Sequence, residues 1–100
     1  MTTATIDIGT LITSDPEIRN GEPRIAGTGV TVKRIIGWHT LGLSAEEIAT
    51  EIGHLSLAQV HAALAYYYAN SQEIEALIEA DEQKARESEI HHRRASGATN

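Results

Sequence analysis

The side chains that usually carry catalysis or bind metals lie along this 100-residue sequence without the spacing that either chemistry needs. The chain has no cysteine, which excludes a thiolate nucleophile, a thiolate zinc site and a disulfide framework. No two of its five histidines are four residues apart, which is the spacing that, with a nearby carboxylate, a helical zinc site needs. No G-x-S-x-G occurs, and Ser44, Ser56 and Ser71 are better explained as helix caps. We therefore expect a protein that is not an enzyme and uses no metal or other cofactor and no small-molecule substrate.

Acidic and basic side chains occupy different parts of the sequence. The chain carries 14 Asp and Glu against 8 Lys and Arg, which gives a formal net charge of -6. Between Arg34 and Lys84 there is no lysine or arginine, whereas the same stretch contains Glu46, Glu47, Glu51, Glu73, Glu75, Glu79, Asp81 and Glu82. Phosphate contacts supply most of the nonspecific affinity of proteins for nucleic acid. This stretch therefore favours a protein partner over DNA.

The aromatic residues are a second indication of a protein partner. Tyr66, Tyr67 and Tyr68 point about 100° apart on a helix, so Tyr67 is expected in the core and at least one of its neighbours in solvent. Trp38 also lies off the apolar face of its segment. A tyrosine that lies along the chain's own fourth helix, and a solvated acidic helix face, are the alternatives. The predicted partner-binding residues are Trp38, Tyr66, Tyr68, Glu75, Glu79 and Glu82.

Basic residues near the N-terminus support an alternative function, that of a DNA-binding transcriptional autoregulator. Two copies of the chain could bring these residues together, and a two-stranded ribbon can enter a DNA groove. A glutamine on the third expected helix could read a base edge, although no lysine or arginine lies near it. Solubilising charges on an edge strand are the competing interpretation of the arginines. The residues named for DNA are Arg19, Arg24, Lys33, Arg34, Gln59 and His61.

The first third of the chain holds both prolines and many of the glycines, and we expect it to form a small β segment. Asn20-Gly21 is the dipeptide that a tight hairpin prefers, so it predicts a hairpin between residues 17–19 and 23–25. The β-branched residues of Val30-Thr31-Val32 indicate a further short strand.

Four helices are expected after this segment. Apolar residues at helical spacing predict a helix over 32–41, and two capping-box sequences, which begin at Ser44 and Ser56, open helices over 45–52 and 57–69. The pair over 45–52 and 57–69, with its turn at Gly53, has the outline of a helix-turn-helix. A fourth helix begins near Asn70, is packed up to Ala80 and is solvated afterwards.

The expected organisation is a single domain over 12–80, preceded by an N-terminal arm over 1–11. Residues 81–100 are expected to be a frayed, polar helix end and a disordered tail. A small core with few aromatics favours a second copy, so we expect a homodimer. No signal peptide or membrane span is apparent, which indicates a cytoplasmic protein that does not contact a membrane.

Residues over 12–68 resemble the family named domain of unknown function 433 (DUF433). The resemblance rests on Ile12, Asp15-Pro16, Gly21, Pro23, Ile25, Gly27-Thr28, Val30, Val32, Gly42-Leu43-Ser44, Glu47-Ile48, Leu55-Ser56, Val60 and Ala63-Leu64-Ala65-Tyr66-Tyr67. It implies a fold that is mainly α, with a short β segment followed by a homeodomain-like helix-turn-helix. Its small bacterial members are described as antitoxin-like, which implies a PIN-like nuclease toxin as partner. The family usually has arginine and proline where this chain has Gly29 and Thr31, so any contact made by that arginine is missing here.

Overall fold

The computed structural model describes residues 5–97, with the side chains of residue 19 and of residues 90–97 left out. Over these residues it has two short strands, β1 (Ile12–Thr13) and β2 (Arg24–Ile25), and four α-helices. The helices are α1 (Val32–Thr40), α2 (Ala45–Ile52), α3 (Leu57–Ala69) and α4 (Ser71–Gly97). Two 3-10 turns, η1 (Ile8–Thr10) and η2 (Arg19–Gly21), lie in the N-terminal third. The expected class, mainly helical with a small N-terminal β segment, is confirmed.

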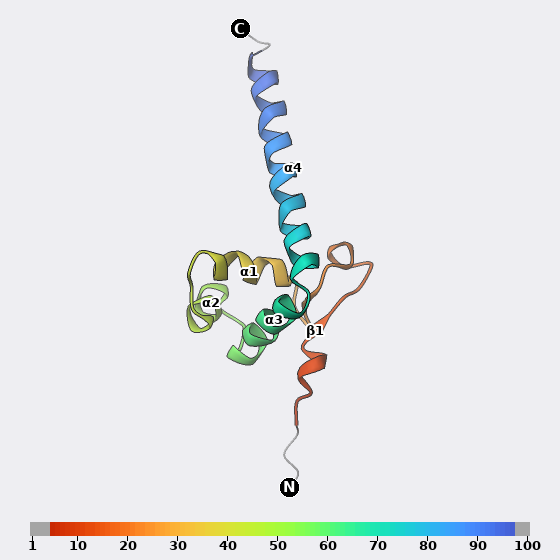
Figure 1. Cartoon of the computed structure of the whole chain (residues 1–100), viewed down its shortest axis with the longest axis vertical. Coiled ribbons are helices and arrows are strands. Elements are labelled where there is room, and N and C mark those ends of the chain that lie inside the picture. The colour runs from red at the N-terminus through yellow and green to blue at the C-terminus, as the bar shows by residue number, and fades with distance from the viewer. Residues whose placement is uncertain (1–4, 98–100) are drawn as a thin grey trace.

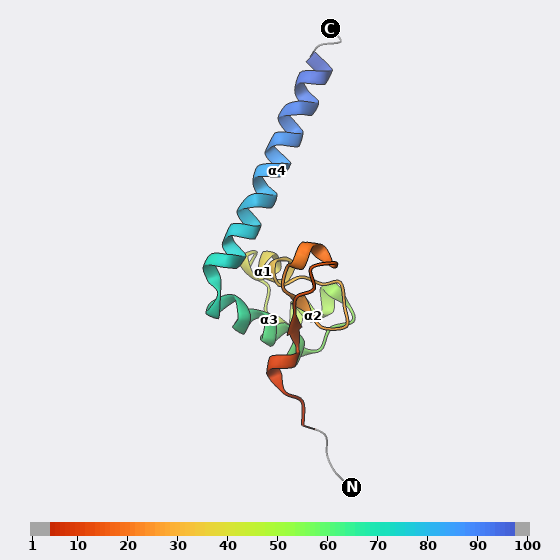
Figure 2. The same ribbon diagram turned by 90° about the vertical axis from the view of Figure 1, so that its right-hand side faces the viewer.

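The molecule consists of a rounded head, formed by residues 12–70, a long helix that projects from it, and the N-terminal residues 5–11, which extend from the opposite side (Figures 1 and 2). Figures 1 and 2 show α4 leaving the head beside α1 and running away from all other elements. The longest dimension is 73 Å, against 29 and 23 Å across. The radius of gyration is 17.1 Å, larger than the ~13 Å of a rounded chain of this length, because α4 extends so far.

The core of the head is aliphatic and is organised around α3, which packs against α1, α2, β1 and β2. Its fully buried side chains come from every part of the head and from the start of α4, and they include Ile25, Val32, Ile35, Ile36, Ile48, Val60 and Ile74. Trp38, Tyr66 and Tyr67 only pack against the edge of this cluster. Aromatic side chains therefore lie where a second molecule can reach them.

The bounds of α2 and α3 agree with the sequence because both capping boxes form. The Ser44 hydroxyl accepts from the Glu47 amide at 3.1 Å, and the Glu47 carboxylate accepts from the Ser44 amide at 2.9 Å. Ser56 and Gln59 make the same reciprocal pair. Gly53 ends α2 with φ at 86°, a left-handed conformation that glycine adopts without strain.

The predicted hairpin over Asn20-Gly21 is wrong. Asn20 and Gly21 do have positive φ, at 56° and 77°, but they close the turn η2 inside the loop that joins β1 to β2. The paired strands are β1 and β2, with Ile12 opposite Ile25. The physical reason is burial. Ile18 is the one large apolar residue of the expected strand over 17–19 and is 39% exposed, whereas Ile25 is fully buried. A hairpin over 17–25 would have had no apolar face to bury.

The predicted strand over Val30–Val32 is also wrong, because Thr31 caps a helix. Its hydroxyl accepts from the Arg34 amide at 3.3 Å, and α1 begins at Val32. Only an isolated bridge between Thr31 and Arg24 remains of the expected pairing. A capping side chain outweighs the β propensity of three residues.

The fourth helix is longer than predicted. Ile74 is buried and Leu77 and Ile78 are half-buried, whereas every side chain from Glu79 to Glu89 is exposed, so the change from packed to solvated is confirmed. The helix α4 continues to Gly97. Between its first residue and its last, α4 contains neither proline nor glycine and is rich in Ala, Glu and Arg, which favour a helix. Residues 98–100 of the expected tail lie outside the described residues.

Candidate partner-binding surfaces

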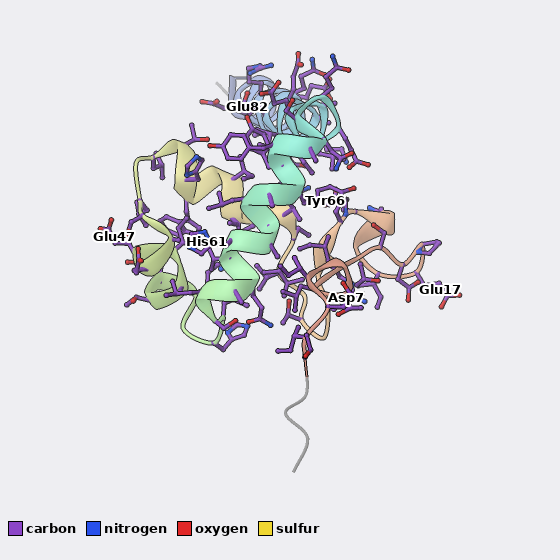
Figure 3. The ribbon with its side chains drawn as sticks, turned by 60° about the horizontal axis from the view of Figure 1, so that its bottom comes forward. Asp7, Glu17, Glu47, His61, Tyr66 and Glu82 are labelled. Carbon is purple, nitrogen blue, oxygen red and sulfur yellow. The ribbon has the colours of Figure 1, made fainter. Side chains whose placement is uncertain are left out.

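The six residues predicted to bind a partner lie on separate surfaces of the head. Trp38 belongs to a hollow between α1 and α2, whereas Glu75, Glu79 and Glu82 line a groove between α1 and α4. Figure 3 shows the separation, with Glu47 on α2 at the left edge of the molecule and Glu82 on α4 at its top. One continuous contact surface is therefore not formed by the predicted set.

The α1–α2 hollow has an apolar floor and an acidic rim. It encloses about 490 Å³ and is lined by Trp38, Leu43, Glu46, Glu47, Thr50 and Glu51. Trp38 and Leu43 are half-buried against the core, and the four residues of α2 are exposed. The Ser44 amide and hydroxyl hold the pKa of the Glu47 carboxyl below its ordinary value, which favours the charged form of this carboxylate. Sequence reasoning assigned Glu47 to a cap and missed the rim, although 46, 47, 50 and 51 share one helical face.

The α1–α4 groove encloses about 460 Å³ and collects acidic side chains of one helical face. Its lining residues are Ile36, Thr40, Tyr67, Glu75, Ile78, Glu79, Glu82 and Arg86. The Tyr67 hydroxyl donates to Glu75 Oε1 at 2.9 Å, and this hydrogen bond is the main reason that the pKa of Tyr67 is raised. Glu75, Glu79 and Glu82 follow one another at i, i+4 and i+7, which places them along the same edge of the groove.

The three tyrosines have different surroundings. The Tyr66 hydroxyl donates to Glu73 at 2.7 Å, and this bond, with burial and the nearby charge, raises the pKa of Tyr66 to about 12. Tyr66 therefore lies along the chain's own fourth helix, as the alternative interpretation held. Tyr68 is 66% exposed, and its ring meets His39 edge to face with the hydroxyl 3.1 Å from Nε2. Tyr68 is thus the tyrosine that faces solvent.

Lys33, one of the residues named for DNA, lies between two carboxylates. Its Nζ is 2.8 Å from Glu22 Oε1 and 2.7 Å from Asp81 Oδ2, so it joins the loop before β2 to α4. Partial burial pulls the pKa of Lys33 down, but the hydrogen bonds and charges of Asp81 and Glu22 outweigh burial and leave this pKa raised. The Lys33 ammonium is therefore engaged in ion pairs within the chain.

The other residues named for DNA are dispersed. Arg24 is half-buried and its Nη1 donates to the Thr28 carbonyl at 2.8 Å, so it braces the turn after β2. Gln59 uses its Oε1 in the cap of α3, at 2.7 Å from the Ser56 amide. Arg34 and His61 are exposed, and Figure 3 shows His61 on the outer side of α3. The side chain of Arg19 lies outside the described residues.

A third hollow, between η1 and α3, was not found from the sequence. It encloses about 310 Å³ and is lined mainly by Ile8, Ile12, Ala62, Ala65, Tyr66 and Ala69. Small residues at 62, 65 and 69 share one face of α3, and this spacing was the signal that could have revealed it. Ile8, at its edge, is 69% exposed.

Over residues 5–97, no cluster of three or more His, Cys, Asp or Glu side chains is placed to hold a metal ion. Among the helices within the same part of the chain, none combines the length and the apolar character that crossing a bilayer requires.

Comparison with known proteins places the chain in a family. The family profile DUF433, described as a protein of unknown function, matches residues 12–67. A similar solved structure is the crystal structure of a DUF433 member protein from Anabaena variabilis ATCC 29413, with a TM-score of 0.65 and 25% sequence identity over 69% of this chain and 68% of that one. No curated protein matches the sequence. The match over more than half its length shows that the chain belongs to the DUF433 family.

Proposed function

We propose that this protein is a non-catalytic, antitoxin-like binding protein of the cytoplasm that neutralises a PIN-like nuclease toxin by direct contact. A nuclease toxin is proposed as the partner because the family that the sequence resembles has members described as antitoxin-like. The physical support comes from charge and shape, because a nuclease that binds RNA presents a basic surface to its substrate. A protein that covers such a surface needs carboxylates around an apolar anchor point.

The observation that carries the proposal is the α1–α2 hollow. Trp38 and Leu43 supply an apolar floor, and Glu46, Glu47 and Glu51 supply a rim of carboxylates on one side. An apolar side chain flanked by lysine or arginine on the toxin would fill the hollow and pair with this rim. Tyr68, exposed at the far end of α3, offers a second aromatic contact.

The test is inhibition of the nuclease encoded beside this protein's gene. The purified full-length chain should bind that nuclease and stop its cleavage of RNA. The double variant Glu46→Lys/Glu51→Lys should weaken binding by about a hundredfold, because it replaces attraction at the rim by repulsion. The matched control is Glu17→Lys/Glu87→Lys, which changes net charge equally at two exposed positions away from the hollow.

Two results would end the proposal. One is a neighbouring nuclease that neither binds nor is inhibited by the wild-type chain. The other is equal weakening by the rim variant and the control variant, because the effect would then come from net charge and not from the hollow. Circular dichroism of both variants checks that the helices are intact.

The alternative function is a DNA-binding autoregulator that uses α2 and α3 as a helix-turn-helix, or the basic residues around β2. The observation in its favour is that Arg34 and His61 are exposed. Lys33, Arg24 and Gln59 are each engaged within the chain, which leaves few groups to contact phosphate. A gel-shift titration with the upstream DNA of its own gene, at low and high salt, tests this alternative, and no binding at low salt would exclude it.

A further inference from the structure

We propose that two copies of this chain pair through antiparallel α4 helices, so that the basic end of one α4 lies in the α1–α4 groove of the other. The inference goes beyond the contact with a nuclease and concerns a different surface. The α1–α2 hollow is on the other side of α1, since Trp38 and Ile36 point about 200° apart on that helix. It therefore stays open in such a pair.

The first support is the projecting half of α4, which the head contacts only near its base, where Lys33 pairs with Asp81. From Glu79 to Glu89 every side chain is exposed, and Figures 1 and 2 show this part of the helix clear of all other elements. A helix that is polar all round and unpacked is marginal in water and is typical of a segment that reaches another molecule. An α4 helix from a second copy would give it a neighbour along its length.

The second support is the order of charges along α4. Residues 73–82 contain Glu73, Glu75, Glu79, Asp81 and Glu82 and no lysine or arginine. Residues 84–94 contain Lys84, Arg86, Arg93 and Arg94 against Glu87 and Glu89, with two histidines. In an antiparallel pair the acidic half of each helix meets the basic half of the other, whereas a parallel pair would bring like charges together. The order of charges therefore favours a second copy of α4 as the partner and favours its antiparallel orientation.

The third support is that the residues of one face are arranged symmetrically about position 84. Helical spacing places Glu75, Ile78, Glu82 and Arg86 on the face that lines the groove, and the same spacing continues to position 93. With a two-fold axis at position 84, Glu82 lies opposite Arg86, position 75 opposite Arg93, and Ile78 opposite a second isoleucine at position 90. Positions 79 and 89 are both glutamate, the one like-charge contact in this register.

Two of these charges have no ion-pair partner among the side chains that the structure describes. Within the described residues, Glu82 and Arg86 take part in no ion pair, although they lie one helical turn apart on α4. In the pair, Glu82 of each copy would meet Arg86 of the other, so this ion pair would form twice, once on each side of the axis.

The groove has the shape to receive the end of a helix. Ile36, Tyr67 and Ile78 form its floor, Glu75 and Glu79 its acidic edge, and its volume of about 460 Å³ admits several side chains. A full overlap of two α4 helices would extend over about 40 Å, from 27 residues at ~1.5 Å each. Contacts of that length, with polar edges, are typical of a reversible dimer and not of an obligate one.

Sedimentation velocity of the full-length chain over a wide range of concentration tests the pairing. We expect a reversible dimer at about 0.05 M salt that dissociates at about 0.5 M salt, because its attraction is largely between exposed charges. Glu82→Arg and Arg86→Glu should each raise the dissociation constant at least about tenfold, since each variant places like charges opposite one another twice. An equimolar mixture of the two variants should restore the dimer, because arginine at 82 then meets glutamate at 86.

Glu87→Arg is the matched control, because it changes the same charge on α4 about 120° away from the paired face and should leave the dimer unchanged. A monomer at every concentration at low salt would overturn the proposal. A mixture that fails to recover the dimer, or a control that weakens it equally, would also overturn it. No nuclease is present in these measurements, so their failure is distinct from failure of the proposed function.

Discussion

Lys33→Gln is expected to lower the free energy of unfolding by about 2 kcal/mol. The pair with Glu22 is partly buried, with side chains 20% and 18% exposed, and contributes about 1 kcal/mol. The pair with Asp81, which is 53% exposed, contributes about 0.5 kcal/mol. The remainder is the cost of leaving the Glu22 carboxylate half-buried without a cation.

Urea titration followed by circular dichroism at pH 7 measures this loss. Lys84→Gln is the matched control. Lys84 lines one pocket together with Lys33, Glu22 and Asp81, is exposed, and takes part in no ion pair among the described residues. Its effect should be within about 0.5 kcal/mol. Raising the salt concentration should shrink the difference between the two variants, since part of the attraction is screened. Equal destabilisation by both substitutions would refute the assignment of Lys33 as a tether.

The same residue sets a dependence on alkaline pH. The pKa of Lys33 is raised in the folded chain, so the folded state holds this proton more tightly than the unfolded state does. Its contribution is therefore complete below the unfolded pKa of about 10.4 and is lost as the pH rises through the folded pKa. Lys33→Gln should remove this part of the alkaline loss of stability.

Three further predictions concern the base of α4 and the turn after α2. Ile74→Ala should cost about 3 kcal/mol in a urea titration, because Ile74 is fully buried between α4 and the head, and a loss below about 1 kcal/mol would contradict that burial. The wild type should lose about 1 kcal/mol of stability, after allowance for solvent exposure, as the pH rises from ~10 through the Tyr66 pKa of about 12. Tyr66→Phe should abolish this loss. Gly53→Ala should cost about 1 kcal/mol, since φ is 86°, whereas Gly37→Ala, in α1 with open space around it, should not destabilise.

Local chemistry explains which elements could be predicted from the sequence. The helices α2 and α3 begin at capping boxes whose two hydrogen bonds depend only on residues three apart, so their bounds could be read directly. The strands could not, because the pairing of Ile12 with Ile25 depends on which residue reaches the core. Asn20-Gly21 adopts its preferred conformation in a different turn, which shows that turn chemistry fixes a bend and not the strands beside it.

The candidate site was predicted in part. Trp38 and the glutamates of α4 do lie at hollows, but helical spacing does not reveal that these hollows are different, because that depends on how α1 packs against α2 and α4. Tyr66 and Tyr68 could not be told apart by helical spacing alone. Their partners separate them, since Tyr66 donates a hydrogen bond to Glu73, whereas Tyr68 contacts His39 and Tyr67.

The contact between Lys33 and Asp81 has a geometric consequence for the far end of the molecule. Asp81 lies about 24 Å along the helix from Gly97, from 16 residues at ~1.5 Å each. If α4 is a stiff rod, a tilt of about 10° at this contact moves the far end by about 4 Å, roughly the width of a side chain. The length of α4 amplifies small changes at its base. The ion pair of Lys33 with Asp81 therefore helps to set the direction of α4. That direction determines the position of the far end of α4 relative to a bound molecule.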